Sequence, residues 1–167
     1  MGRYLYLMRH AKSSWKEPFP DRERPLNKRG KRAARTVGEA LARRGIEFDR
    51  VYTSDARRAR STAKRLLRAM GASRERLQKD PRLYRGGGEE IVEFVHTLND
   101  SDKRVLIVGH NPALSDALFL LGAADNRDWL PTGAIVGLHF DSEHWKEILP
   151  GTGDMVLKLL PRSLEEK

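Results

Sequence analysis

The sequence predicts a three-layer αβα sandwich with a mostly parallel central sheet and a C-terminal hairpin or edge strands. Short apolar runs alternate with segments of helical periodicity, which is typical of a parallel sheet covered by helices. The last part of the chain instead holds two strand-like runs around a turn. A chain of 167 residues lies within the size range of one domain, so we expect a single domain over residues 1–167.

Five apolar runs are predicted to be strands. Runs at 3–9, 50–54 and 103–110 are short and bounded by polar residues or glycine, as in strands buried on both faces of a sheet. Runs at 134–140 and 155–160 flank the turn-rich segment 150–154 and predict the late hairpin or sheet edge.

Four segments with helical periodicity lie between these runs, and a loop rich in charge and proline covers 16–25. The helices are expected from about 27 to 44 before Gly45, from about 59 to 70 before Gly71, and around 89–98. A fourth should open at Asn111, as a cap residue, with Pro112 in the first helical position.

Composition narrows the function classes. The net charge of +9 favours anionic ligands, such as phosphorylated small molecules, acidic or phosphorylated proteins, or nucleic acid. The absence of cysteine excludes disulfides, thiolate zinc sites and cysteine nucleophiles. No run approaches the ~20 apolar residues of a membrane span, and the first apolar run is too short for a signal peptide core, so we expect a cytoplasmic protein with no membrane partner.

Two histidines follow predicted strands directly. His10 comes after Arg9 at the end of the first strand, and His110 ends the run at 103–110. In open α/β sheets, ligands bind at the carboxyl edge of the strands. Either histidine alone would more often be structural, but together they place two imidazoles and a guanidinium at one edge.

A third strand end adds a second arginine. The segment 54–62 (SDARRARST) follows the strand at 50–54, and Ser54 or Asp55 is expected to cap the helix that begins there. Arg58 would then lie in the first helical turn, beside backbone N–H groups that favour an anion. Guanidinium forks match phosphate oxygens, and no carboxylate or thiolate set accompanies them, so the cluster predicts a metal-free phosphate pocket that contains a nucleophile.

Four segments carry a family resemblance: 7–11 (LMRHA), 24–30 (RPLNKRG), 54–62 (SDARRARST) and 108–112 (VGHNP). In order and spacing they resemble the histidine phosphatase superfamily, also called phosphoglycerate mutase-like, and most closely its small SixA-type phosphohistidine phosphatase branch. The resemblance implies that His10 is the nucleophile and that Arg9, Arg58 and His110 bind the phosphoryl group. It implies a hydrolase with a covalent phosphohistidine intermediate and no metal or cofactor.

The sequence departs from the family pattern in three places. Ala11 replaces the usual glycine, Asp55 replaces proline, and no carboxylate is plainly placed as the acid that protonates a leaving group. Because imidazole leaves more readily than an alkoxide, the missing acid favours P–N substrates. Glu89 and Glu90, which follow a glycine triplet, are the candidate proton donors.

Three further residues are candidate substrate ligands. Arg24 either reaches the phosphate or caps its loop, and Lys12 and Ser13 follow the nucleophile closely enough to bond phosphate oxygens. Arg57 and Arg60 are expected on the solvated surface. His96, His139 and His144 are expected to be structural.

The leading hypothesis is a phosphatase that acts on phosphohistidine or a similar phosphoramidate, in a phosphorylated protein or a small molecule. The alternatives are a small-molecule phosphomonoesterase of the same superfamily and a non-catalytic module that binds phospho-ligands or nucleic acid. Nucleic acid is the less favoured partner, because binding alone would not require a nucleophile.

Overall fold

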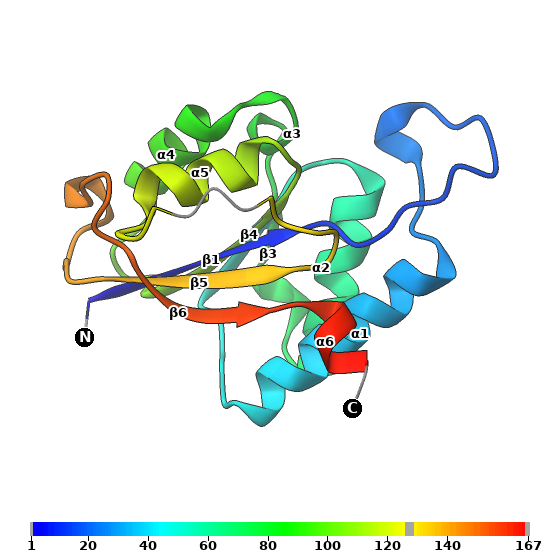
Figure 1. Ribbon diagram of the computed structural model, residues 1–167, viewed down its shortest axis with the longest axis horizontal. Helices are drawn as coiled ribbons and strands as arrows, with labels where there is room; N and C mark the ends of the chain where they lie inside the picture. Colours follow the sequence, from blue (N-terminus) through cyan, green and yellow to red (C-terminus); the bar gives the residue numbers. More distant parts are fainter. Residues whose placement is uncertain (1, 126–128, 166–167) are drawn as a thin grey trace.

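The computed structural model describes residues 2–125 and 129–165 and confirms the three-layer α/β fold (Figure 1). The central sheet has six strands in the order β3-β2-β4-β1-β5-β6. The first four run parallel to one another: β1 (Arg3–Arg9), β2 (Arg50–Thr53), β3 (Leu77–Lys79) and β4 (Arg104–Gly109). The antiparallel pair β5 (Ile135–Phe140) and β6 (Asp154–Leu159) forms the predicted C-terminal hairpin at the sheet edge, whereas β3 was not predicted.

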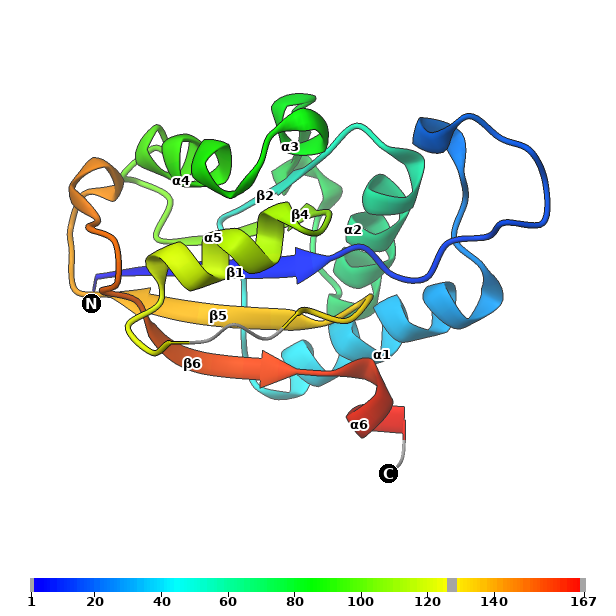
Figure 2. The ribbon, with the colours of Figure 1, turned by 45° about the horizontal axis from the view of Figure 1, so that its top comes forward.

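Helices cover both faces of the sheet (Figures 1 and 2). One layer contains α1 (Lys28–Arg43), α2 (Arg57–Met70) and the short α6 (Pro161–Glu165). The other contains α3 (Arg82–Arg85), α4 (Gly88–His96) and α5 (Ala113–Leu121). Single 3-10 turns lie at Asp21–Glu23, Arg74–Arg76 and Trp145–Glu147. Within the described ranges, no helix combines the length and apolar character needed to cross a membrane.

The alternation of side chains along β1 divides the core into two halves. Leu5 and Leu7 pack with α4 and α5, while Tyr6 and Met8 pack with α1 and α2. Burying a side chain of this size stabilises the fold by about 1.5–3 kcal/mol. Because both faces of β1 are anchored, the residues that follow its carboxyl end are held in place.

The four predicted helices correspond to α1, α2, α4 and α5, whereas α3 and α6 were not predicted. α4 ends at His96, two residues before the expected end. α1 begins after Asn27, whose side-chain oxygen accepts a hydrogen bond from the N–H of Gly30 at 2.8 Å. α2 begins at Arg57 after Ala56 with no side-chain cap, so the expected cap by Ser54 or Asp55 is wrong.

The start of α5 also differs from the prediction. α5 begins at Ala113, one residue after Pro112, so the proline is not in the first helical position. The cap residue is Pro112 rather than the predicted Asn111, although the side-chain oxygen of Asn111 accepts from the N–H of Ser115 in the first turn at 3.1 Å.

Candidate active site

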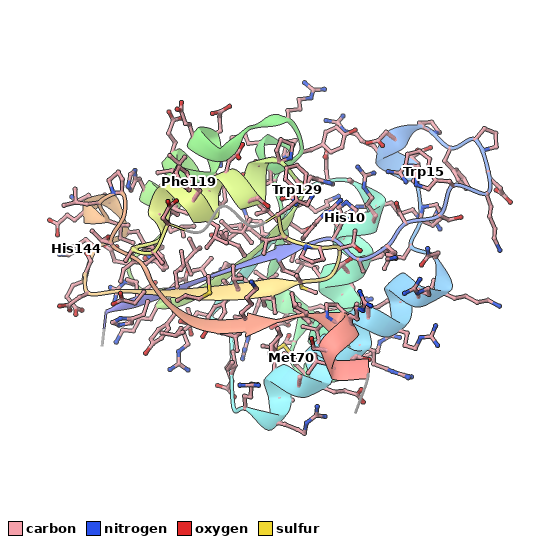
Figure 3. The ribbon with its side chains drawn as sticks, viewed as in Figure 1. His10, Trp15, Met70, Phe119, Trp129 and His144 are labelled. Atoms are coloured by element: carbon pink, nitrogen blue, oxygen red, sulfur yellow. The ribbon has the colours of Figure 1, made fainter. Side chains whose placement is uncertain are left out.

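The two predicted histidines lie side by side at the carboxyl edge of the sheet. β1 and β4 are parallel neighbours in which Arg9 is paired with Gly109, so the next residue of each strand is a histidine. The N–H of His10 donates to the carbonyl of Gly109 at 2.9 Å, and the ring centroids of His10 and His110 are 5.1 Å apart. Figure 3 shows His10 at the carboxyl end of β1.

The ring of His10 is held with one nitrogen available. Its Nδ1 lies 2.8 Å from the carbonyl oxygen of Ala11. A carbonyl only accepts, so Nδ1 carries the proton and Nε2 carries the lone pair. Thr62 secures this turn from α2, since its hydroxyl accepts from the N–H of Ala11 at 3.0 Å and donates to the carbonyl of Arg58 at 2.7 Å.

His110 is held by the residue that was expected to cap α2. The hydroxyl of Ser54 lies 2.7 Å from Nε2 of His110. Nδ1 of His110 and Nε of Arg9 are buried and have no hydrogen-bond partner among residues 2–125 and 129–165. Leaving such groups unpaired costs free energy. A phosphoryl oxygen is a suitable partner for either of them.

Both histidines are neutral near pH 7. Burial is the main cause that lowers the pKa of His10 to about 4; the charges of Arg58, Arg9 and Arg24 act in the same direction, and the hydrogen bond to Ala11 opposes them. Burial, followed by the neighbouring His10 and Arg58, lowers the pKa of His110 to about 3. A neutral imidazole with a lone pair on Nε2 is the form that can attack phosphorus.

Arg58 connects His10 to two residues that the sequence analysis missed. Only 6 % exposed, Arg58 directs its Nε–H at Nε2 of His10, 3.4 Å away. Its Nη1 donates to the main-chain carbonyl of Asp21 at 2.6 Å, and its Nη2 donates to the Asp21 carboxylate at 2.9 Å. The Tyr84 hydroxyl donates to the same carboxylate at 2.6 Å, and its ring lies 5.4 Å from that of His110. Asp21 lies in a 3-10 turn of three residues and Tyr84 in a helix of four residues, and neither is long enough to show a periodic pattern in the sequence.

The candidate substrate ligands that follow His10 mostly bind one another. Arg24 is 6 % exposed, its Nη1 donates to the Ser13 hydroxyl at 2.6 Å, and its guanidinium lies 3.5 Å from the centre of the Trp15 ring. Lys12 is exposed. Arg24 therefore braces its loop, while its charge still acts on His10.

The carboxylate placed against Arg58 is Asp21 rather than either candidate acid. Glu89 and Glu90 are exposed in the first turn of α4, where the Glu90 carboxylate accepts from the N–H of Gly87 at 3.0 Å. The hydrogen bond from Tyr84, followed by the contacts with Arg58, lowers the pKa of Asp21 to about 2, so it has no proton to donate near pH 7. In the described part of the chain, no group of three or more His, Cys, Asp or Glu side chains is arranged to hold a metal.

The remaining histidines lie elsewhere. Nε2 of His96 pairs with the carbonyl of Ile148 at 2.9 Å, and Nδ1 of His144 pairs with Asp100 at 2.8 Å. Figure 3 shows His144 beyond the opposite end of the sheet from His10.

This chain is similar to known proteins in sequence and in fold. Residues 5–84 match the model of the histidine phosphatase superfamily (branch 1). An uncharacterized protein of Mycobacterium tuberculosis is 30 % identical over 164 residues, which covers 93 % of this chain and 100 % of that protein. A 2,3-bisphosphoglycerate-dependent phosphoglycerate mutase of Bartonella quintana is 42 % identical over 76 residues, which covers 44 % of this chain and 37 % of the mutase.

Two solved structures share the whole fold. One from Nakamurella multipartitia, described as a candidate phosphohistidine phosphatase SixA, is 27 % identical with a TM-score of 0.81, covering 96 % of this chain and 97 % of that chain. The other is described as the protein histidine phosphatase SixA complexed with tungstate. It is 21 % identical with a TM-score of 0.83, covering 96 % of this chain and 99 % of that chain.

Proposed function

This chain belongs to the histidine phosphatase superfamily, and we propose that it is a phosphatase that transfers a phosphoryl group first to His10 and then to water. The observation that carries the proposal is the state of the His10 ring, which is neutral, buried and fixed with the lone pair on Nε2 beside Arg58. The net charge of +9 supports a phosphorylated substrate, either a protein or a small molecule.

The reaction has two steps. In the first, Nε2 of His10 forms a bond to phosphorus while the bond between phosphorus and the leaving group breaks, and Arg9, Arg58 and His110 hold the phosphoryl oxygens. In the second, water attacks phosphorus, the N–P bond breaks, and its electron pair returns to Nε2. Both protons of the water leave with the inorganic phosphate, which then ionises in solvent. Neither step requires a metal or a cofactor.

The substrate class follows from the acids around the pocket. Asp21 is ionised, and Glu90 is bound to the start of α4, so neither is set to protonate a leaving group. A P–N substrate needs this help least, because a protonated phosphohistidine releases a neutral imidazole. The similarity to SixA structures supports the same choice. We therefore propose phosphohistidine or a related phosphoramidate as the substrate.

A leaving-group series tests this function. With chelator present throughout, phosphohistidine, phosphoramidate and aryl phosphates should turn over, and alkyl phosphates should be slower by at least about 10²-fold in kcat/KM, because an alkoxide leaves poorly without an acid. An alkyl phosphate with kcat/KM equal to or above that of phosphohistidine would contradict the P–N assignment. Glu89→Gln and Glu90→Gln would then identify the donor by slowing alkyl esters far more than aryl esters.

The pH profile tests the protonation state of His10. Its pKa is lowered to about 4, so lowering the pH removes the nucleophile's lone pair only well below the ordinary range of histidine. After correction for ionisation of the substrate, kcat/KM should be flat from neutral pH down to about one unit above that pKa and should fall below it. A decline that begins near the ordinary histidine pKa would mean that burial does not keep the ring neutral.

A further inference from the structure

Asp21 is the point at which three elements around the pocket meet. Its carboxylate accepts from Tyr84 of α3 at 2.6 Å, from Nη2 of Arg58 in α2 at 2.9 Å, and from Nε of Arg24 at 3.3 Å. Its main-chain carbonyl accepts from Nη1 of Arg58 at 2.6 Å. No other part of the mechanism uses this residue, which the surrounding donors nevertheless fix in one orientation.

These contacts decide which edge of Arg58 faces the nucleophile. A guanidinium presents an end edge, made by Nη1 and Nη2, and a side edge, made by Nε and Nη2. The main-chain carbonyl of Asp21 accepts from Nη1 and its carboxylate accepts from Nη2, so Asp21 occupies the end edge. The Nε–H points at Nε2 of His10. The side edge is therefore the one left for phosphoryl oxygens.

We propose that Asp21 is a positioning residue for phosphoryl transfer, which acts by holding the side edge of Arg58 toward His10, and that Tyr84 holds Asp21 in turn. This inference rests on the proposed function. Asp21 touches Arg58 and not the reacting atoms, so its effect reaches the reaction through the orientation of one guanidinium. Misplacement of such a group by about 1 Å can slow a reaction by 10²-fold.

The opposite possibility is that Asp21 blocks the pocket as a competing anion. The two roles predict changes of opposite sign. If the carboxylate positions Arg58, its removal slows turnover. The same removal takes a negative charge from the pocket, so a simple anion should bind as well or better. A blocking carboxylate, in contrast, would raise turnover when removed.

The test compares Asp21→Ala, Asp21→Asn and Asp21→Glu with wild type, using phosphoramidate as substrate and inorganic phosphate as inhibitor. We expect Asp21→Ala to lower kcat by about 10- to 100-fold while the inhibition constant for phosphate stays within about 3-fold or tightens. Asp21→Asn and Asp21→Glu should recover part of kcat, and Tyr84→Phe should cause a smaller loss in the same direction. Glu23→Gln, which removes an exposed carboxylate from the same 3-10 turn, should change neither constant.

The outcomes distinguish a failure of the role proposed for Asp21 from a failure of the proposed phosphatase function. A wild-type protein with no turnover overturns the proposed function and the inference together. An active wild type with undiminished kcat in Asp21→Ala overturns the inference alone, and increased kcat shows a blocking role instead. Parallel loss of kcat and phosphate binding, or failure of Asp21→Glu to recover any kcat, shows that Asp21 merely maintains the fold of its loop.

Discussion

Replacement of His10 by alanine should lower turnover by at least ~10³-fold, the order of loss seen when a covalent nucleophile is removed. The expected size follows from the position of the ring, which Ala11 and Arg58 fix with the lone pair on Nε2. His110 lies 5.1 Å away between ring centroids, but its Nε2 is bound to Ser54, so it is not placed to substitute. Steady-state rates with phosphoramidate measure the loss.

The matched control is His144→Ala, at the far end of the sheet (Figure 3). It removes the contact between two exposed side chains, Nδ1 of His144 and the carboxylate of Asp100, and exposed contacts of this kind contribute little to stability. Its turnover should equal that of wild type. Thermal unfolding of both variants checks that the protein remains folded at the assay temperature. A folded His10→Ala protein that retains a tenth of wild-type turnover would refute the nucleophile assignment.

Arg58→Lys should lower kcat/KM by about 10²-fold although it preserves the charge, because an ammonium lacks the planar fork of a guanidinium. Arg58 uses three nitrogens at once, two toward Asp21 and one toward His10. A lysine at this position can keep the charge but cannot hold Asp21 and offer a side edge to the phosphoryl group together. Kinetics with phosphoramidate provide the comparison.

The neighbouring residue supplies the control for that substitution. Arg57 is exposed, and its Nη1 donates to the carbonyl of Glu23 at 3.4 Å. Arg57→Lys should remain within about 2-fold of wild type, since exposed charges of this kind contribute little. The reverse order of effects would mean that the first turn of α2 presents a different arginine to the pocket.

The central sheet could be predicted from the sequence, and so could the grouping of Arg9, His10, Arg58 and His110. The reason is that the carboxyl ends of parallel strands meet at one edge of the sheet. Apolar runs marked β1 and β4, and two adjacent parallel strands bring the residues after them together, as His10 and His110 show. The presence of glycine at position 30, in the segment 24–30, is also explained by a close contact, since a Cβ on Gly30 would lie 2.1 Å from the carbonyl oxygen of Lys12. In both cases a short pattern in the sequence reflects a close contact.

The surroundings of the pocket were not predictable in this way. Asp21 lies in a short 3-10 turn, and Tyr84 lies in a helix of four residues, which is too short to show helical periodicity in the sequence. Ser54 fits the composition of a helix cap, but its contact with His110 depends on the pairing of β2 with β4. The strand β3 has three residues and no fully buried side chain, so it carries no apolar signal.

The most direct test of His10 as phosphoryl acceptor is to locate the phosphoryl group in the wild-type protein. A single turnover with radiolabelled phosphoramidate, quenched in alkali and mapped by peptide mass spectrometry, captures the covalent intermediate before water removes it. We expect an acid-labile phosphoryl group on His10, attached through Nε2, whose formation and loss match the turnover rate. A phosphoryl group on His110 or on any other residue, with none on His10, would contradict the mechanism.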